Sequence, residues 1–471
     1  MKKSIFRKKS IPDLVAASKS GTTLHKELGT LDLTLLGIGA IIGTGIFVLT
    51  GTGALTAGPA LIISFIIAGL ACLFAALSYA EFASTVPVSG SVYTYTYATM
   101  GEFIAWIIGW DLILEYLLAV SAVSVGWSGY FQSLLKGMGI HLPTVFTAAP
   151  GAVPGTTTYF NLPAFLIVML ITFLLSVGVK QSKRVNNIMV VLKVIVVILF
   201  IVVAVGYVKP ANWTPFTPFG FNGIFEAAAL VFFAFIGFDA IASAAEETKN
   251  PNRDLPKGIM LSLLICTILY VVVTGIMTGV VPFGQFKGNE DHPISLVLQV
   301  AGQDWVAGIV DVGAILGMTT VMLVMLYGQT RVSYAMARDG LLPNFFKSVH
   351  QKYRTPYGST WFFGIVAGLM GALIPLNELA KLVNIGTLSA FVLVSVAVMV
   401  LRKTQPDLPR AFRCPAVPLI PILAIVFCGF LMAQLDGATW IRFIIWLGIG
   451  VLIYFGYSKR HSQLNREKTN I

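Results

Sequence analysis

The chain has 471 residues, of which 56% are hydrophobic and only 11% are Asp, Glu, Lys or Arg, and its formal net charge is +11. Soluble domains usually carry about a quarter charged residues, so this composition excludes a soluble protein with an ordinary water-facing surface. Apolar stretches long enough to cross a hydrocarbon core of about 30 Å recur along most of the chain. The composition therefore predicts an all-α membrane protein.

Twelve transmembrane helices are predicted in chain order. The third and the eighth are longer than a crossing requires, so we expect them to tilt or to project from the membrane. The predicted spans cover residues 30–56, 59–84, 101–132, 161–180, 186–208, 222–247, 257–281, 296–330, 357–375, 379–402, 418–434 and 438–458.

Two segments between the spans have an unusual composition. Residues 84–100 are too polar to cross the membrane and carry no charge, which indicates an interfacial or re-entrant element. Residues 331–356 mix apolar and basic side chains, as in a helix that lies on the inner leaflet or in a plain basic connector.

The spans are expected to form two repeats. Residues 30–208 hold the first five helices and residues 222–402 the next five, whereas residues 418–458 add two more. An odd number of helices in a repeat forces the two repeats into opposite orientations. The remaining segments, 1–29 and 459–471, are expected to be cytoplasmic tails, and the polar first tail has no cleavable signal pattern.

The charges indicate how the chain lies in the membrane. With both termini inside, most of the 32 Lys and Arg residues fall on the inner side, which is the bias expected of a multi-pass protein of the plasma membrane. The basic balance is therefore explained by topology and by contact with membrane lipid. It does not indicate a nucleic-acid partner.

No composition feature indicates a cofactor, a metal or a catalytic centre. All five histidines fall in loops or tails, and the four cysteines offer no pair for a disulfide on the outer face. We find no zinc-ligand pair, nucleophile elbow or phosphate-binding loop. We therefore expect that the protein is not an enzyme and needs neither cofactor nor metal.

Two spans carry features that weaken a helix. The first holds four glycines within nine residues, at positions 37, 39, 43 and 45, and the sixth holds Gly237 and Asp239 in its middle. Each glycine in a helix interior costs about 1 kcal/mol relative to alanine. We predict interruptions near residues 43–45 and 234–237, because inverted repeats with interrupted first helices are typical of secondary transporters.

The first interruption predicts a site for a carboxylate. Unwound backbone at Gly43, Thr44 and Gly45 would present free N–H groups and the positive end of a half-helix. Ile41, just before the interruption, is also assigned to the substrate-binding site. The alternative is that the glycines serve close helix packing, since Gly39-x-x-x-Gly43 is a small-xxx-small pattern.

The second interruption predicts a site for an ammonium group. It would leave the carbonyl groups of residues 232–234, which include Phe233 and Ala234, at a negative helix end. Phe235, Ile236 and Phe238 would then line a pocket for the ligand's side chain. The alternative is that these aromatic residues face lipid.

Two ionisable residues inside spans are candidates for proton coupling, because such residues are functional by default. Lys193 lies in an otherwise apolar span and could exchange a proton or occupy the place of a sodium ion; alternatively, it could extend to the interface. Glu115 could pair with Lys193, approach the substrate or carry protons, and its alternative is a purely structural role.

The sequences GIGAIIGTGIF in the first span and FFAFIGFDAIASAAEETKNPNRDLP across the sixth resemble the amino acid–polyamine–organocation transporters. The likeness covers residues 25–460 in span count and spacing, and it is closest to bacterial proteins of the cationic amino acid transporter branch. The resemblance implies a five-plus-five inverted repeat with interrupted helices 1 and 6, alternating access, and amino-acid symport or exchange.

The resemblance also implies residue roles. Lys193 matches the fifth-helix lysine that proton-coupled members use in place of sodium. The carboxylate-binding interruption is matched by Gly43, Thr44 and Gly45, and the amine-binding and pocket interruption by Phe233, Ala234 and Ile236.

These observations together predict a proton-coupled transporter of small neutral L-amino acids such as alanine. No carboxylate cluster is evident to hold a cationic side chain, and Met318, Met322 and Met325 would narrow the pocket or pack against lipid. A cationic amino acid transporter or an exchanger is the first alternative, and an amino-acid sensor built on a transporter fold is the second. A small single-span membrane partner is left open.

Overall fold

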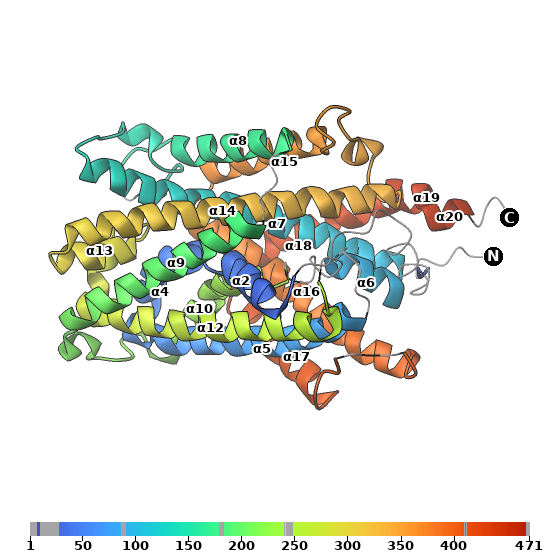
Figure 1. The fold of residues 1–471 in the computed structure, drawn as a ribbon, viewed down its shortest axis with the longest axis horizontal. Coiled ribbons are helices and arrows are strands. Elements are labelled where there is room, and N and C mark those ends of the chain that lie inside the picture. The colour runs from blue at the N-terminus through green and yellow to red at the C-terminus, as the bar shows by residue number, and fades with distance from the viewer. Residues whose placement is uncertain are drawn as a thin grey trace.

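The computed structural model describes residues 7–9, 28–85, 91–153, 155–178, 183–239, 241, 248–408, 410 and 412–467. Every regular element in this part of the chain is a helix, and the β-pairing is limited to an isolated bridge between Leu28 and Thr248. Most helices run along the long axis of the molecule (Figure 1). The all-α prediction is therefore confirmed for the described residues.

The helices have the following bounds: α2 (Thr30–Ile41), α3 (Thr44–Phe47), α4 (Leu49–Ala57), α5 (Leu61–Thr85), α6 (Ser91–Thr99), α7 (Glu102–Gly137), α8 (Leu162–Ser176), α9 (Lys183–Ala204), α10 (Gly220–Val231), α12 (Pro251–Val280), α13 (Pro293–Val300), α14 (Asp304–Arg338), α15 (Tyr357–Leu373), α16 (Leu376–Thr404), α17 (Leu419–Ala433), α18 (Gly437–Ile453), α19 (Lys459–His461) and α20 (Gln463–Glu467). Short 3₁₀ turns join several of them, among them η1 (Gly58–Ala60), η5 (Phe232–Phe235) and η8 (Asn344–Lys347).

Seven helical stretches among the described residues are long and apolar enough to cross a membrane. Five further apolar helices are shorter, so their length alone does not assign them as crossings. The twelve predicted spans therefore stay a prediction. The seven stretches are Leu49–Thr85, Glu102–Gly137, Val185–Tyr207, Pro251–Val280, Asp304–Arg338, Leu376–Thr404 and Gly437–His461; the shorter five are Thr30–Ile41, Leu162–Ser176, Gly220–Phe235, Tyr357–Leu373 and Leu419–Ala433.

Burial separates the centre of the bundle from its rim. In the most apolar 18-residue segment of α7, 83% of the residues are buried. The corresponding segments of the stretches that contain α9 and α18 have 33% and 22% of their residues buried. The helix α7 therefore lies inside the bundle, and α9 and α18 present most of their surface outward. The helices α8 and α15 lie side by side along one edge (Figure 1).

The two segments of unusual composition, 84–100 and 331–356, adopt different structures. Residues 91–99 form α6, whose tyrosines at 93, 95 and 97 are buried in protein, while residues 86–90 lie outside the described part. Of the two interpretations of segment 331–356, a separate leaflet helix is wrong: α14 continues to Arg338, and η8 and turns follow. The basic-connector alternative describes this segment.

Both ends of the described chain meet at one end of the bundle, which we call the basic end. Arg7 pairs with Glu102 of α7 at 3.0 Å, and Lys9 pairs with Asp339 after α14 at 2.6 Å. The backbone N–H of Gln463 also donates to the carbonyl of Asp339. Most of tails 1–29 and the end of 459–471 lie outside the described residues.

A buried ion cluster joins three segments at the basic end. The Glu81 carboxylate of α5 accepts two 2.8 Å hydrogen bonds from Arg402 of α16, and it lies 3.2 Å from the Nε atom of Arg410. The backbone N–H of Cys414 donates to the same carboxylate at 2.8 Å. Glu81 is fully buried, so its charge depends on these donors.

We expect Glu81→Gln to destabilise the fold strongly, because two arginines at this site would lose their carboxylate. Removing one partner of a buried ion pair typically costs about 3 to 5 kcal/mol. Thermal unfolding in detergent measures the effect. Lys381→Gln is the control, because it removes an exposed pair with Asp436, and exposed pairs contribute about 1 kcal/mol or less. Equal melting temperatures for the two variants would refute the assigned role.

Candidate functional site

The first predicted span is interrupted in the structure. The helix α2 ends at Ile41, and α3 begins at Thr44. Ile42 and Gly43 between them are not helical: Ile42 has extended angles, and Gly43 has a φ of −159° and a ψ of −139°. The first N–H groups of a helix have no partner within it, so the start of α3 offers backbone donors at this point.

The sixth predicted span is also interrupted. The helix α10 ends at Val231, η5 follows, and Ile236 takes extended angles. Gly237 has a φ of +117°, a conformation that residues with a side chain rarely adopt. Residues 240 and 242–247, the inner part of this predicted span, lie outside the described residues.

The two interruptions lie directly against each other. A side chain at Gly45 would collide with the backbone of Ala234, and one at Gly237 would come within 2.9 Å of the Ala40 carbonyl oxygen. Gly39 packs just as closely against Val190. Gly39 and Gly45 therefore do serve close helix packing, the alternative considered above, and the first helix is interrupted between them as well.

Lys193 caps the first interruption. Its ammonium donates to the carbonyl oxygens of Gly39 at 2.7 Å and Ile42 at 3.2 Å, and its side chain is 1% exposed. Its aliphatic part packs against Gly317 of α14. The alternative that Lys193 extends to the membrane interface is therefore wrong. The positive charge lies at the carbonyl end of α2, where the helix dipole favours a cation.

Tyr270 of α12 connects the two interruptions, a role that the sequence analysis missed. Its hydroxyl lies 2.8 Å from the carbonyl oxygen of Ala234 and 3.1 Å from that of Ile41. Its ring packs against Phe65 and Phe235. A single tyrosine in an apolar span was the only sequence signal, and it does not reveal which carbonyl groups the hydroxyl meets.

An amide from a third helix stabilises the second interruption. The side chain of Asn384 in α16 donates to the carbonyl oxygens of Ala229 and Leu230 at 2.7 and 2.9 Å. Loosened backbone at this depth must find partners in protein, because lipid offers none. Asn384 and Tyr270 supply such partners for α10 and η5.

Glu115 lies apart from Lys193. It is 3% exposed and lies beside the Thr387 hydroxyl of α16, near the carboxylates of Asp111 and Asp239. The Tyr116 hydroxyl lies 3.2 Å from an oxygen of Asp239. The pairing of Glu115 with Lys193 that we considered is therefore wrong, since Lys193 is held by carbonyl groups instead.

The predicted pocket residues are buried in protein. Phe233 and Ile236 are nearly inaccessible, and Phe235 and Phe238 are completely so, which excludes the lipid-facing alternative. On the other side, the Thr44 hydroxyl lies 3.4 Å from the Met318 sulfur. The three methionines considered in the eighth span, Met318, Met322 and Met325, are buried as well.

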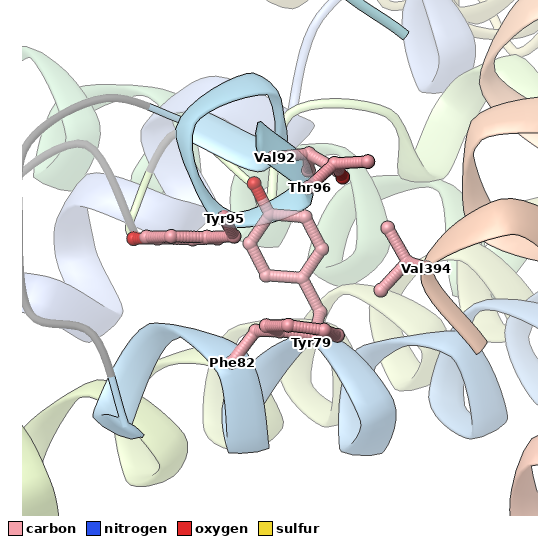
Figure 2. A pocket seen from close by; sticks show the side chains of 6 residues that line it. All are labelled: Tyr79, Phe82, Val92, Tyr95, Thr96 and Val394. Carbon is pink, nitrogen blue, oxygen red and sulfur yellow. The ribbon is translucent and has the colours of Figure 1, made fainter. Parts of the chain in front are cut away.

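Aromatic side chains close the space between the second interruption and the basic end. Tyr79 of α5 packs edge-on against Phe238, and Phe82 stacks on Tyr95 of α6 with an interplanar angle of 8°. The Tyr79 ring stands between α5 and α6 in Figure 2. These residues, together with Val92, Thr96 and Val394, surround a gap too narrow for a water molecule.

The chain is similar over nearly its whole length to known permeases and transporters. The family model described as amino acid permease matches residues 28–455. The branched-chain amino acid permease BcaP of Bacillus subtilis (strain 168) is 73% identical over 99% of this chain and 100% of its own length. The methylthioribose transporter of the same strain is 54% identical over 98% and 100%. The vacuolar cationic amino acid transporter 4 of Arabidopsis thaliana is 33% identical over 98% and 96%.

The contact between the two interruptions predicts the effect of one methyl group. We expect Gly45→Ala to push α3 away from Ala234 and to lower the free energy of unfolding by about 1 to 3 kcal/mol, as overpacking does. Gly448→Ala in α18 is the control, because a methyl group there meets no other residue. Thermal unfolding of both variants in detergent tests this. A Gly45→Ala protein as stable as its control would show that the contact is not tight.

Proposed function

The chain belongs to the amino acid permease family, and from this membership we propose that it is a secondary active transporter that takes up small neutral L-amino acids by alternating access. The relatives are named as permeases and transporters, and such proteins are not enzymes. The proposed location is the plasma membrane, with the basic end and both termini in the cytoplasm. The charge bias of the sequence supports this orientation.

One observation carries the proposal: two interrupted helices meet with opposite backbone polarity. The N–H groups at Gly43, Thr44 and Gly45 would bind the carboxylate of the amino acid. The carbonyl groups of Ile41, Phe233, Ala234 and Ile236 would accept from its ammonium. The single Tyr270 hydroxyl lies within hydrogen-bond distance of two of these oxygens, but a carbonyl oxygen has two lone pairs and can accept a second hydrogen bond.

The residues around the interruptions support a neutral, apolar substrate side chain. Phe233, Phe235 and Ile236 on one side and Met318 on the other are apolar and buried. The carboxylate of Glu115 is buried beside Thr387 and two other carboxylates. We therefore rank alanine and branched-chain amino acids first, the latter because of the name of the Bacillus relative, and cationic amino acids second.

We further propose that proton transfer at Lys193 drives uptake. The protonated amine donates to the Ile42 carbonyl, inside the interruption that would bind the carboxylate. Loss of the proton would weaken this bond and allow the interruption to change its conformation. The charge of Lys193 and the shape of the substrate site are thereby coupled. Glu115, near Asp239 at the second interruption, is the second proposed proton-carrying residue.

Uptake by reconstituted protein tests the transport proposal. Proteoliposomes with an inward proton gradient should accumulate labelled alanine and leucine above the external concentration, and unlabelled arginine should compete poorly. Collapse of the gradient by a protonophore should abolish accumulation. Uptake that requires internal amino acid and ignores the gradient would establish the exchanger alternative. Binding without any uptake would establish the sensor alternative.

The coupling role of Lys193 has its own test. We expect Lys193→Met to lose gradient-driven accumulation, because its side chain cannot carry a proton, while amino-acid counterflow without a gradient persists at a reduced rate. Lys287→Met, at an exposed loop position, is the control and should transport normally. Gradient-driven accumulation by Lys193→Met would show that protons are carried elsewhere.

A further inference from the structure

A cationic cavity lies at the basic end, beside the end of α18. It has a volume of about 260 Å³ and is lined by Arg7, Phe455, Lys459, Arg460 and Asn465. Three of these five residues are cations, and none is an acid. The helices α19 and α20 continue from α18 past this point (Figure 1).

Arg7 is the innermost cation of this cavity. Its Nη2 atom pairs with Glu102 at 3.0 Å, but its Nε atom is buried and has no hydrogen-bond partner among the described residues. The residue is only 9% exposed, so water does not readily replace the missing acceptor. A buried donor without an acceptor costs about 1 to 3 kcal/mol. Arg7 therefore retains unused donor capacity in the protein wall beside the cavity.

An apolar stripe leads along α18 to the cavity. Its members recur at spacings of three or four residues, so they lie on one helix face. All are exposed, from 43% at Ile449 to 74% at Leu452, on a helix that is mostly at the rim of the bundle. The stripe consists of Ile441, Ile445, Ile449, Leu452 and Phe455.

We propose that this cavity binds the phosphate group of an anionic phospholipid from the leaflet at the basic end, with the acyl chains of the lipid along the stripe on α18. Lys459 and Arg460 would meet the phosphate at the rim, and the positive charge of Arg7 would attract it from the wall of the cavity. Basic pockets at the ends of transmembrane helices attract such headgroups. A soluble phosphate could bind the same cations, but it has no acyl chains to contact the apolar stripe.

The bound lipid would also hold the N-terminal segment in place. Glu102, the partner of Arg7, accepts hydrogen bonds from Tyr97, Tyr454 and Ser462 as well. This network joins residue 7 to α6, α7 and the segment after α18. A phosphate on Arg7 would therefore stabilise the contact between both termini and the bundle.

The test compares lipids on the purified full-length protein. Phosphatidylglycerol should bind, as counted by native mass spectrometry, and should raise the melting temperature, whereas phosphatidylcholine and inorganic phosphate should do neither. Each cation near a lipid surface contributes about 1 kcal/mol, so the variant Lys459→Gln with Arg460→Gln should bind phosphatidylglycerol roughly 20- to 30-fold more weakly. Lys347→Gln with Lys352→Gln removes the same charge from exposed positions at the same end and is the control.

The outcomes separate the possibilities. Unchanged lipid binding in the double variant, or an equal loss in the control, would overturn the proposal. Stabilisation by inorganic phosphate that matches that of phosphatidylglycerol would also overturn it and would indicate a soluble anion. If the double variant does not fold, Arg460→Gln alone, at an exposed position, should still weaken binding about fivefold. Failure of the transport assays would not affect this result.

Discussion

Backbone groups that leave a helix inside a membrane must find partners in the protein, and this constraint organises the centre of the structure. Two helices are interrupted here, and side chains from three other helices satisfy the exposed carbonyl groups. Lys193 donates to a carbonyl oxygen near the end of α2, and Asn384 donates to one near the end of α10. The Tyr270 hydroxyl lies between the carbonyl groups of the two interruptions. The same groups that make the interruptions stable thus hold polar backbone ready in the bundle interior.

Small residues are the second requirement. The interruptions can lie against each other only because Gly45 leaves room for the backbone of Ala234 and Gly237 leaves room for the Ala40 carbonyl. Packing and ligand binding are therefore not competing explanations for these glycines. Close approach is what brings the donors of one helix within reach of the acceptors of the other.

Charge is distributed differently in the centre and at the basic end. At the basic end, buried carboxylates are paired with arginines, as Glu81 is with Arg402 and Glu102 with Arg7. In the centre, Lys193 donates to carbonyl groups, and Glu115 lies beside the Thr387 hydroxyl. Full ion pairs lock segments together, whereas the carbonyl partners of Lys193 are neutral, so the proposed loss of its proton would leave no opposite charge unpaired. This difference suits a rigid end and a responsive centre.

The sequence by itself determined the helical membrane class, the family and the positions of the two interruptions, because hydropathy, glycine placement and two motifs are local properties of the chain. It also identified Lys193 and Glu115 as ionisable residues inside the membrane spans, since a charged residue in an apolar stretch is visible without a structure. Only the tertiary structure decided their partners, the role of Tyr270 and the cavity around Arg7. Those features depend on which carbonyl groups and side chains meet across helices far apart in the chain, and spacing along one helix carries no information about that.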